Sequence, residues 1–348
     1  MSSSRPALFA LIISVVIAQT SIASAETEPE EALQIEEEEE LSWYDEVVEW
    51  WSPRYLVGYS LIAGGIGMYA LGDGRRPRTD AMIGPSYDPT DPEPIFTAEE
   101  VGEPYRVHDT VSTGELHVLV FATGAGIAAM EAMEWYRRDG KGQRFHDAMV
   151  GYVESSMLTS VITSWSKPMV GRLRPDFGAR ARRHHCSLEP EQFGSMCQGY
   201  ENRPLAYSQR RSQRRIVDGR KSFFSGHASA SLNMATYASL VVGGNYVWSA
   251  DATARSRGLG IGAQTFLMSS GVAVAATRVM DNRHHRSDVL IGGVLGFGIA
   301  HLSYWRRFGS DGRVTVLARD EFDDSSRFAL QLTPMVEGAG FSLSLHHR

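Results

Sequence analysis

Residues 277–288 read T-R-V-M-D-N-R-H-H-R-S-D, and the interpretation of the whole chain starts from this stretch. Arg278 precedes His284 by six residues, and Asp288 follows His284 by four. Because four residues make about one helical turn, the Asp288 carboxylate can reach the His284 ring and hold one of its nitrogens. The other ring nitrogen is then free and more basic, as a nucleophile or general base requires. Arg278 adds a planar, permanently charged group suited to an oxyanion or a phosphate.

Two earlier stretches supply further groups of the same kind. Residues 167–175 read K-P-M-V-G-R-L-R-P, which places Lys167 and Arg174 about two helical turns apart, so that both could face one anion. Residues 224–227 read F-S-G-H. Ser225 is suited to cap the start of a helix, and Gly226 allows close approach of the backbone. A helix N-terminus presents free N–H groups to an anion, and His227 would lie beside that anion.

In this order the three stretches resemble the signature of the type 2 phosphatidic acid phosphatase superfamily. This superfamily includes bacterial class A acid phosphatases and vanadium-dependent haloperoxidases. The resemblance covers roughly residues 116–305, with Phe224 where proline is usual and Thr277 where serine is usual. Neither of these positions would carry chemistry. The resemblance implies an all-α fold, a helical bundle of the acid phosphatase and vanadium haloperoxidase type.

The resemblance also implies the roles of individual residues in a metal-independent phosphatase. Its substrates would be phosphomonoesters or pyrophosphates, either lipid phosphates or small soluble esters, hydrolysed through a phosphohistidine intermediate. His284 would attack phosphorus, oriented by Asp288, and His227 would protonate the leaving oxygen and then activate water. His284 is preferred over His285 because only His284 has the Arg and Asp at these spacings. The residues expected to bind the phosphoryl group are Lys167, Arg174, Ser225, Gly226 and Arg278.

The sequence is compatible with two alternatives to a phosphatase. In a vanadium-dependent haloperoxidase the same pocket would hold vanadate as a cofactor, and a histidine would ligate vanadium. For a phosphatase we expect no metal and no cofactor, and vanadate would be an inhibitor. A non-catalytic envelope protein is disfavoured, because every proposed catalytic position is filled.

Composition is that of a folded, exported protein. The chain has 348 residues, of which 43% are hydrophobic and 22% charged, and a net charge of −7 that argues against nucleic-acid binding. Residues 1–25 combine Arg5, an apolar core and a small-x-small site, as in a signal peptide, with an uncleaved membrane anchor as the alternative. Residues 26–50 read as an acidic linker, and 51–310 as the helical phosphatase domain.

The C-terminal residues 311–348 change pattern. Residues alternate between apolar and polar at Arg313–Leu317, Phe328–Leu332 and Phe341–Leu345, which predicts a small antiparallel β appendage. Within the helical domain, helices are expected at Tyr55–Leu71, Glu115–Met133, Ala148–Ser166, Ser225–Trp248, Ile261–Thr277 and Val289–Trp305.

A long, strongly basic insertion is expected at Asp176–Lys221. In an exported protein, its Cys186 and Cys197 favour one disulfide, whereas the adjacent His184 and His185 leave a metal site as the weaker alternative. Next to an anion pocket, the arginines of this insertion could attract phosphorylated substrates or anionic lipid headgroups, although a solvated surface loop is equally compatible with the sequence.

The sequence is compatible with two arrangements of the protein relative to the membrane. The expected helices at Ala148–Ser166 and Ser225–Trp248 are polar for lipid, and a mean hydropathy of −0.21 is low for a chain with many spans. These observations favour a soluble bundle in the periplasm or cell envelope, associated with a membrane surface. The alternative is a five-span membrane protein with its site on the outer face. We expect a phosphorylated lipid or small-molecule substrate, and no protein or nucleic-acid partner.

Overall fold

The computed structural model describes residues 56–87, 109–137, 142–188, 191, 197, 209–314, 328–334 and 341–347. The helices of the bundle are α3 (Leu56–Asp73), α4 (Thr113–Arg137), α5 (Gln143–Val170), α9 (Gly226–Tyr246), α10 (Ala254–Met280) and α11 (Arg286–Trp305). Between α5 and α9 lie α6 (Phe177–Leu188) and α8 (Gln209–Gly219). The expected helical bundle is therefore confirmed.

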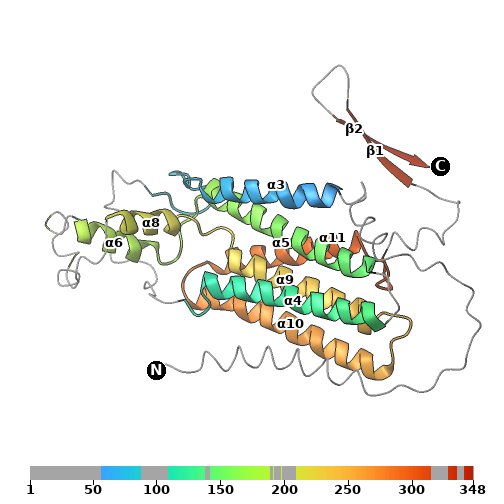
Figure 1. Cartoon of the computed structure of the whole chain (residues 1–348). Helices are drawn as coiled ribbons and strands as arrows, with labels where there is room; N and C mark the ends of the chain where they lie inside the picture. Colours follow the sequence, from blue (N-terminus) through green and yellow to red (C-terminus); the bar gives the residue numbers. More distant parts are fainter. Residues whose placement is uncertain are drawn as a thin grey trace, which may run out of the picture.

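Helix α9 is at the centre of the bundle. It packs against α4, α5, α10 and α11, while α3 packs on the outer side of α5 (Figure 1). The core along α9 is built of large buried side chains, including Tyr152, Tyr237, Tyr304 and Phe308. Because α5 and α10 end, and α9 and α11 begin, at one end of the bundle, segments distant in sequence meet there.

The polar residues of α5 and α9 point into the bundle and hydrogen-bond to one another. The Thr163 and Ser229 hydroxyls are 3.1 Å apart, and the Asn233 amide donates to the Ser155 hydroxyl at 2.6 Å. Asn233 and Ser155 are both buried. The polar residues of α5 and α9 therefore face the inside of the bundle. Their number says nothing about the polarity of its outer surface.

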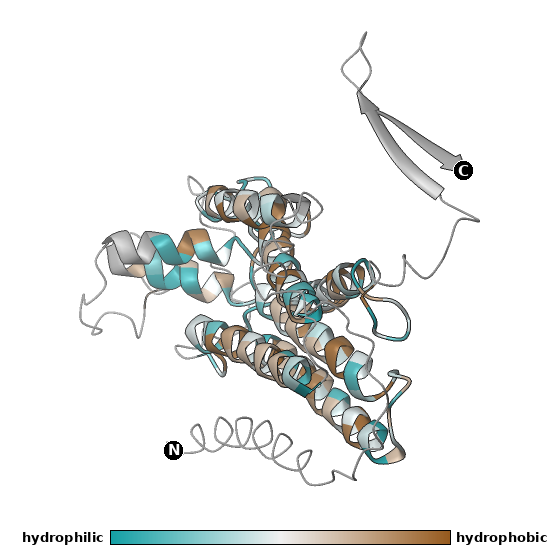
Figure 2. Ribbon diagram, turned by 45° about the vertical axis from the view of Figure 1, so that its right-hand side comes forward, coloured by the Kyte–Doolittle hydropathy of each residue, from teal (hydrophilic) through white to brown (hydrophobic). Residues whose placement is uncertain are grey.

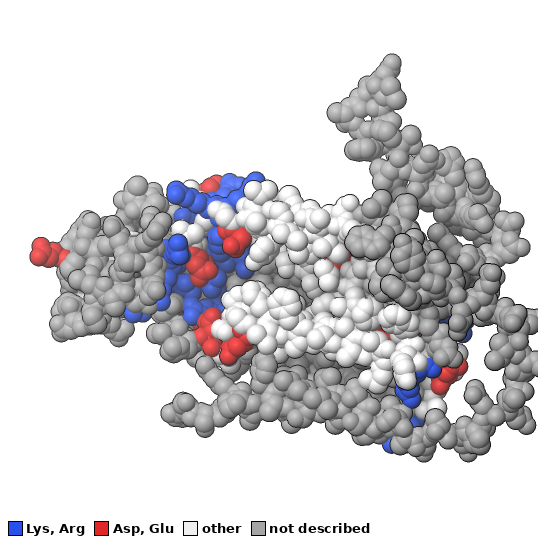
Figure 3. Space-filling model, in the orientation of Figure 1, with Lys and Arg blue, Asp and Glu red and all other residues white. Residues whose placement is uncertain are grey.

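The outside of the bundle is apolar. Helices α4, α10 and α11 are each long and apolar enough to cross a membrane. Many residues of the bundle helices are hydrophobic, whereas the described residues of α6 and α8 are mainly hydrophilic (Figure 2). On the face shown in Figure 3, most charged side chains gather at the left end and a smaller group lies at the lower right, with an uncharged stretch along the helices between them. Large apolar side chains exposed on this exterior include Leu71, Phe121, Ile261, Val272, Leu290, Val294 and Leu302.

Helices α6 and α8 form a lobe that projects from the bundle (Figure 1). Phe177, Ala181 and Ile216 pack there against Tyr87 in a small core of their own. The predicted disulfide between Cys186 and Cys197 is confirmed and closes part of the lobe. The segment expected to be a long insertion is thus partly helical, because α6 and α8 each have an apolar side that can be buried against the other.

The C-terminal region contains an antiparallel pair, β1 (Phe328–Pro334) and β2 (Phe341–His347), with Phe328 opposite His347. These strands coincide with two of the three expected strand segments. Most of the third segment, Arg313–Leu317, lies outside the described residues, as do the signal peptide and the acidic linker. A packed β appendage therefore stays a prediction.

Close packing of α11 on α9 requires glycine. A Cβ atom at Gly292 would lie 2.7 Å from the backbone oxygen of Ser225, whereas a Cβ at Gly298 would meet nothing within 4 Å. We expect Gly292→Ala to destabilise the bundle by about 1–3 kcal/mol, because backbone has to move to accept the methyl group. Gly298→Ala, on the same helix, should leave stability unchanged or slightly higher. Thermal unfolding of both variants in one detergent measures the difference, and equal unfolding temperatures would contradict this packing.

Candidate active site

The first motif lies where α5 ends. Lys167 is in the last turn of α5, and Gly171 ends the helix with φ 66°, a left-handed conformation that glycine adopts without strain. The chain then turns to pair with the segment before α9. The Arg174 N–H donates to the Gly219 carbonyl at 2.8 Å, and the Ser222 N–H donates to the Arg172 carbonyl at 3.0 Å. These bonds fix the direction of Arg174.

The second motif begins α9. The Ser225 hydroxyl accepts from the Ala228 N–H, as expected for an N-cap, and the Ser225 N–H donates to the Asp288 carbonyl at 3.0 Å. Gly226 allows α5 to come close, since a Cβ there would be 3.1 Å from the Lys167 Nζ. The open N-terminus of α9, with His227 in its first turn, therefore lies beside Lys167.

The third motif forms the turn between α10 and α11. The His284 N–H donates to the Arg278 carbonyl at 3.2 Å, which folds the turn back over the end of α10. Asp288 caps α11 by accepting from the His285 N–H at 3.2 Å. The side chains of Arg278, His284 and Asp288 are all buried.

One predicted contact is not formed. The His284 Nδ1 atom lies 4.0 Å from the Asp288 carboxylate, too far for the hydrogen bond that the four-residue spacing suggested. Nδ1 lies instead 2.7 Å from the backbone oxygen of Ser222. The difference arises because His284 is in the turn before α11 and not in its first helical turn, so the spacing is not that of one helix face.

Asp288 is occupied by other donors. Its Oδ1 accepts from Arg172 Nη1 at 2.6 Å, and its Oδ2 accepts from the Ser222 hydroxyl at 2.6 Å. Neither Arg172 nor Ser222 was identified from the sequence. Arg172 lies between Lys167 and Arg174 in the first motif, and Ser222 lies before the second, so only the folded chain brings them to Asp288.

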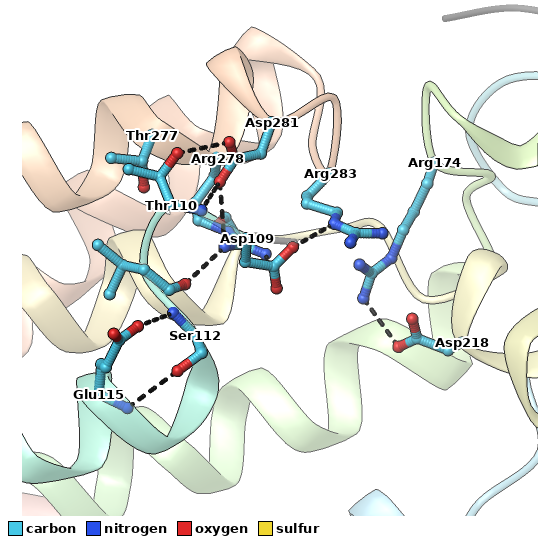
Figure 4. A network of polar contacts seen from close by, with 12 residues as sticks. Asp109, Thr110, Ser112, Glu115, Arg174, Asp218, Thr277, Arg278, Asp281 and Arg283 are labelled. Carbon is cyan, nitrogen blue, oxygen red and sulfur yellow. Dashed lines mark hydrogen bonds and ion pairs between the residues drawn. The ribbon is translucent and has the colours of Figure 1, made fainter. Parts of the chain in front are cut away.

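Two arginines of the pocket, Arg174 and Arg278, each lie beside a carboxylate (Figure 4). Arg174 Nη2 donates to Asp218 at 2.9 Å, and Arg278 Nη2 lies 3.5 Å from Asp109. Further ion pairs connect these two pairs, so that arginines and aspartates alternate in one continuous series. In order its members are Arg174, Asp218, Arg180, Asp176, Arg283, Asp109 and Arg278.

Asp109 and Thr110 are further residues that the sequence did not reveal. Asp109 accepts from Arg283 Nε at 2.6 Å. The Thr110 N–H and hydroxyl both donate to Asp281 at 2.7 Å, and Arg278 Nη1 donates to the Val111 carbonyl at 3.0 Å. The segment before α4 therefore holds the end of α10 and the guanidinium of Arg278.

Several buried nitrogen atoms of the pocket lack partners within the described part of the chain. They are His227 Nε2, Arg174 Nε and Arg278 Nε. Buried polar groups in folded proteins are normally satisfied, so such donors and acceptors indicate a site for a polar ligand. With Lys167 beside them, the ligand that fits best is an oxyanion. Among the described residues, no group of three or more His, Cys, Asp or Glu side chains could hold a metal ion.

The electrostatics of the pocket keep both histidines neutral. Burial, followed by Arg174 and Lys167, lowers the pKa of His284 well below its usual value. Burial and Arg278 lower the pKa of His227 to about 3, while Asp109 acts in the opposite direction. Burial and Arg174 lower the pKa of Lys167 to about 8. Bound negative charge would reverse part of each shift, because it offsets the surrounding cations.

The fold and the site define a helical bundle in which cationic side chains and two histidines gather at one end. Comparison with known proteins gives its family. Residues 148–310 match the sequence model of the PAP2 superfamily. Phospholipid phosphatase 2 of Rattus norvegicus is 28% identical over 214 residues, which cover 59% of this chain and 72% of the relative. The corresponding protein of Mus musculus is 31% identical over 46% of this chain and 52% of the relative.

A fungal relative is similarly distant. The probable diacylglycerol pyrophosphate phosphatase 1 of Schizosaccharomyces pombe is 26% identical over 61% of this chain and 71% of the relative. No solved structure matches the chain at a significant level. These matches support membership of the type 2 phosphatidic acid phosphatase superfamily and an activity as a phosphoric ester hydrolase.

Removing the carboxylate beside Arg278 tests the outer support of the pocket. In Asp109→Asn, Arg278 and Arg283 lose a charged partner, so we expect kcat/KM to fall by about 10- to 100-fold, the size of loss expected when a guanidinium loses a hydrogen-bond partner. Asp80→Asn is the control, because Asp80 pairs with Arg78 in an exposed ion pair. That pair should contribute little, and equal effects of the two substitutions on phosphate release would contradict the assignment.

Oxyanion binding should take up protons. Because its pKa is lowered to about 3, His227 is unprotonated near neutral pH, and a bound dianion should raise that pKa, so binding is expected to take up about one proton. Calorimetric titration with tungstate in buffers of different ionisation enthalpy measures this number. His227→Gln should remove most of the uptake. Binding without proton uptake in the wild-type protein would show that His227 does not gain a proton from the bound charge.

Proposed function

We propose that this protein is a metal-independent lipid phosphate phosphatase, which hydrolyses a phosphomonoester or a pyrophosphate at the end of a membrane-embedded bundle. The proposal rests on one observation above all. Three buried nitrogen atoms have no hydrogen-bond partner among the described residues, namely His227 Nε2, Arg174 Nε and Arg278 Nε. Besides burial, both arginines lower the pKa of His284, so His284 lies near them. A tetrahedral phosphoryl group would satisfy all three nitrogen atoms. The names of the phospholipid and diacylglycerol pyrophosphate phosphatases that resemble the chain support a lipid substrate.

The mechanism follows from the protonation states. Neutral His284 attacks phosphorus through Nε2, forming an N–P bond as the P–O ester bond breaks. His227, protonated once the anion is bound, gives its proton to the leaving oxygen. It then removes a proton from the water that attacks the phosphohistidine and releases phosphate. Lys167, Arg174 and Arg278 stabilise the negative charge on the phosphoryl oxygens in both steps, and no cofactor is required.

A membrane position fits the distribution of side chains. The candidate spans α4, α10 and α11 are apolar, whereas the pocket lies at the end of the bundle where α5 and α10 end and α9 and α11 begin. In this position the scissile phosphate would be at the membrane surface while the acyl chains stay in lipid. The disulfide lobe projects from the same end, so we place that end in an oxidising compartment outside the cytoplasm. This favours the membrane arrangement over the soluble one.

Substitution of each of two neighbouring histidines tests which of them is the nucleophile. His284→Ala should abolish phosphate release from phosphatidic acid and from diacylglycerol pyrophosphate. His285→Ala should cost far less, because its ring Nε2 is 3.0 Å from the Leu173 carbonyl and serves to hold the loop. Phosphate release by purified variants in detergent measures both. Full activity of His284→Ala, or loss of activity only in His285→Ala, would overturn the assignment.

Parallel assays identify the class of substrate and distinguish a phosphatase from a haloperoxidase. Wild-type protein should hydrolyse lipid phosphates faster than small soluble esters, and its extraction from membranes should require detergent. Vanadate should inhibit, because it mimics the five-coordinate phosphoryl group in the same pocket. Oxidation of bromide by hydrogen peroxide after addition of vanadate would instead support the haloperoxidase alternative.

A further inference from the structure

The tautomer of His284 is set by a backbone carbonyl. Nδ1 lies 2.7 Å from the Ser222 oxygen, and both groups are buried. Because a carbonyl oxygen can only accept, Nδ1 must carry the hydrogen. Nε2 then has the lone pair that an attack on phosphorus needs. The Asp288 carboxylate, at 4.0 Å, is outside hydrogen-bonding distance of Nδ1.

Ser222 is itself fixed by Asp288. Its hydroxyl donates to Asp288 Oδ2 at 2.6 Å, and both residues are fully buried. Its N–H donates to the Arg172 carbonyl, and the Arg172 guanidinium binds the other carboxylate oxygen of Asp288 at 2.6 Å. One residue therefore touches the carboxylate through its side chain and the imidazole through its backbone.

We propose that Ser222 is a positioning residue through which Asp288 acts on His284. The inference deepens the proposed function and rests on it, since it assumes that His284 attacks phosphorus. Asp288 holds the Ser222 hydroxyl, which fixes the direction of the Ser222 carbonyl, and the carbonyl holds the imidazole. When the N–P bond forms, Nδ1 keeps its hydrogen and the ring becomes positively charged. The carbonyl dipole and the nearby carboxylate stabilise that charge.

A double-mutant cycle tests whether the two residues act in series. Ser222→Ala removes the hydroxyl and leaves the carbonyl in place, so we expect kcat to fall by about 10- to 100-fold with little change in KM. Asp288→Asn should lower kcat by at least as much. If Asp288 acts through Ser222, the double variant should be no more than about threefold slower than Asp288→Asn alone. Effects that multiply would overturn the proposal, because each residue would then act on its own.

Ser287 provides a matched control. Its exposed hydroxyl is 2.8 Å from the same Arg172 Nη1 atom that binds Asp288. Ser287→Ala therefore removes a hydroxyl that contacts Arg172. This hydroxyl is not one of the groups that connect Asp288 to His284 through Ser222. We expect kcat within about twofold of wild type, and effects that multiply in combination with Asp288→Asn. A loss as large as that of Ser222→Ala would contradict a specific role of Ser222.

A second measurement does not depend on the folding of Ser222→Ala. In protein labelled with nitrogen-15 in histidine, the His284 signals identify which ring nitrogen carries hydrogen, and His284→Ala assigns them. We expect the Nδ1–H tautomer in wild type and also in Asp288→Asn, because the Ser222 carbonyl remains. A change of tautomer in Asp288→Asn would show that the carboxylate acts on the ring directly. If His284→Ala keeps its activity, the proposed function fails, whereas a multiplicative cycle with inactive His284→Ala overturns only the role of Ser222.

Discussion

The structure depends on concentrating positive charge at one buried place. Lys167, Arg174 and Arg278 are all close enough to His284 to lower its pKa, although like charges repel and burial removes the water that would screen them. The protein balances this charge from outside the pocket. Asp218 and Asp109 bind the far sides of the two arginines, which leaves the inner nitrogens for a substrate.

This balance would allow one pocket to hold two histidines with the two different roles that we propose. Burial and, after it, the surrounding cations lower the pKa of both imidazoles, which would suit His284 as a nucleophile. His227 needs a proton before it can act as an acid, and the negative charge of the substrate can supply the necessary change in pKa. Binding of the anion would therefore give His227 the proton that its proposed role as an acid requires.

Much of the site could be predicted because its chemistry is carried by short local motifs. The helix start at Ser225, the glycine that admits Lys167 and the order of the motifs follow from local rules of capping and close packing. The bundle helices were also expected from long apolar segments. In contrast, the polarity of α5 and α9 was misleading, because hydropathy alone does not tell whether a polar residue such as Asn233 faces the core or the outside.

Contacts between distant segments could not be predicted. Asp109 and Arg283 are 174 residues apart, and Ser222 and Asp288 are 66 apart, so no local pattern connects them. The expected bond between His284 and Asp288 was wrong for a related reason. A spacing of four residues indicates a contact only when both residues are in one helix, and His284 precedes α11.

The central claim is that the three motifs surround a single phosphate-sized anion, and an experimental structure with bound tungstate tests it most directly. The account predicts one tungstate ion in contact with the ring Nε2 atoms of both His227 and His284. Lys167, Arg174 and Arg278 should bind the oxygens of the same ion. A tungstate ion bound elsewhere, or one that contacts only some of these groups because the others are too distant, would contradict the account.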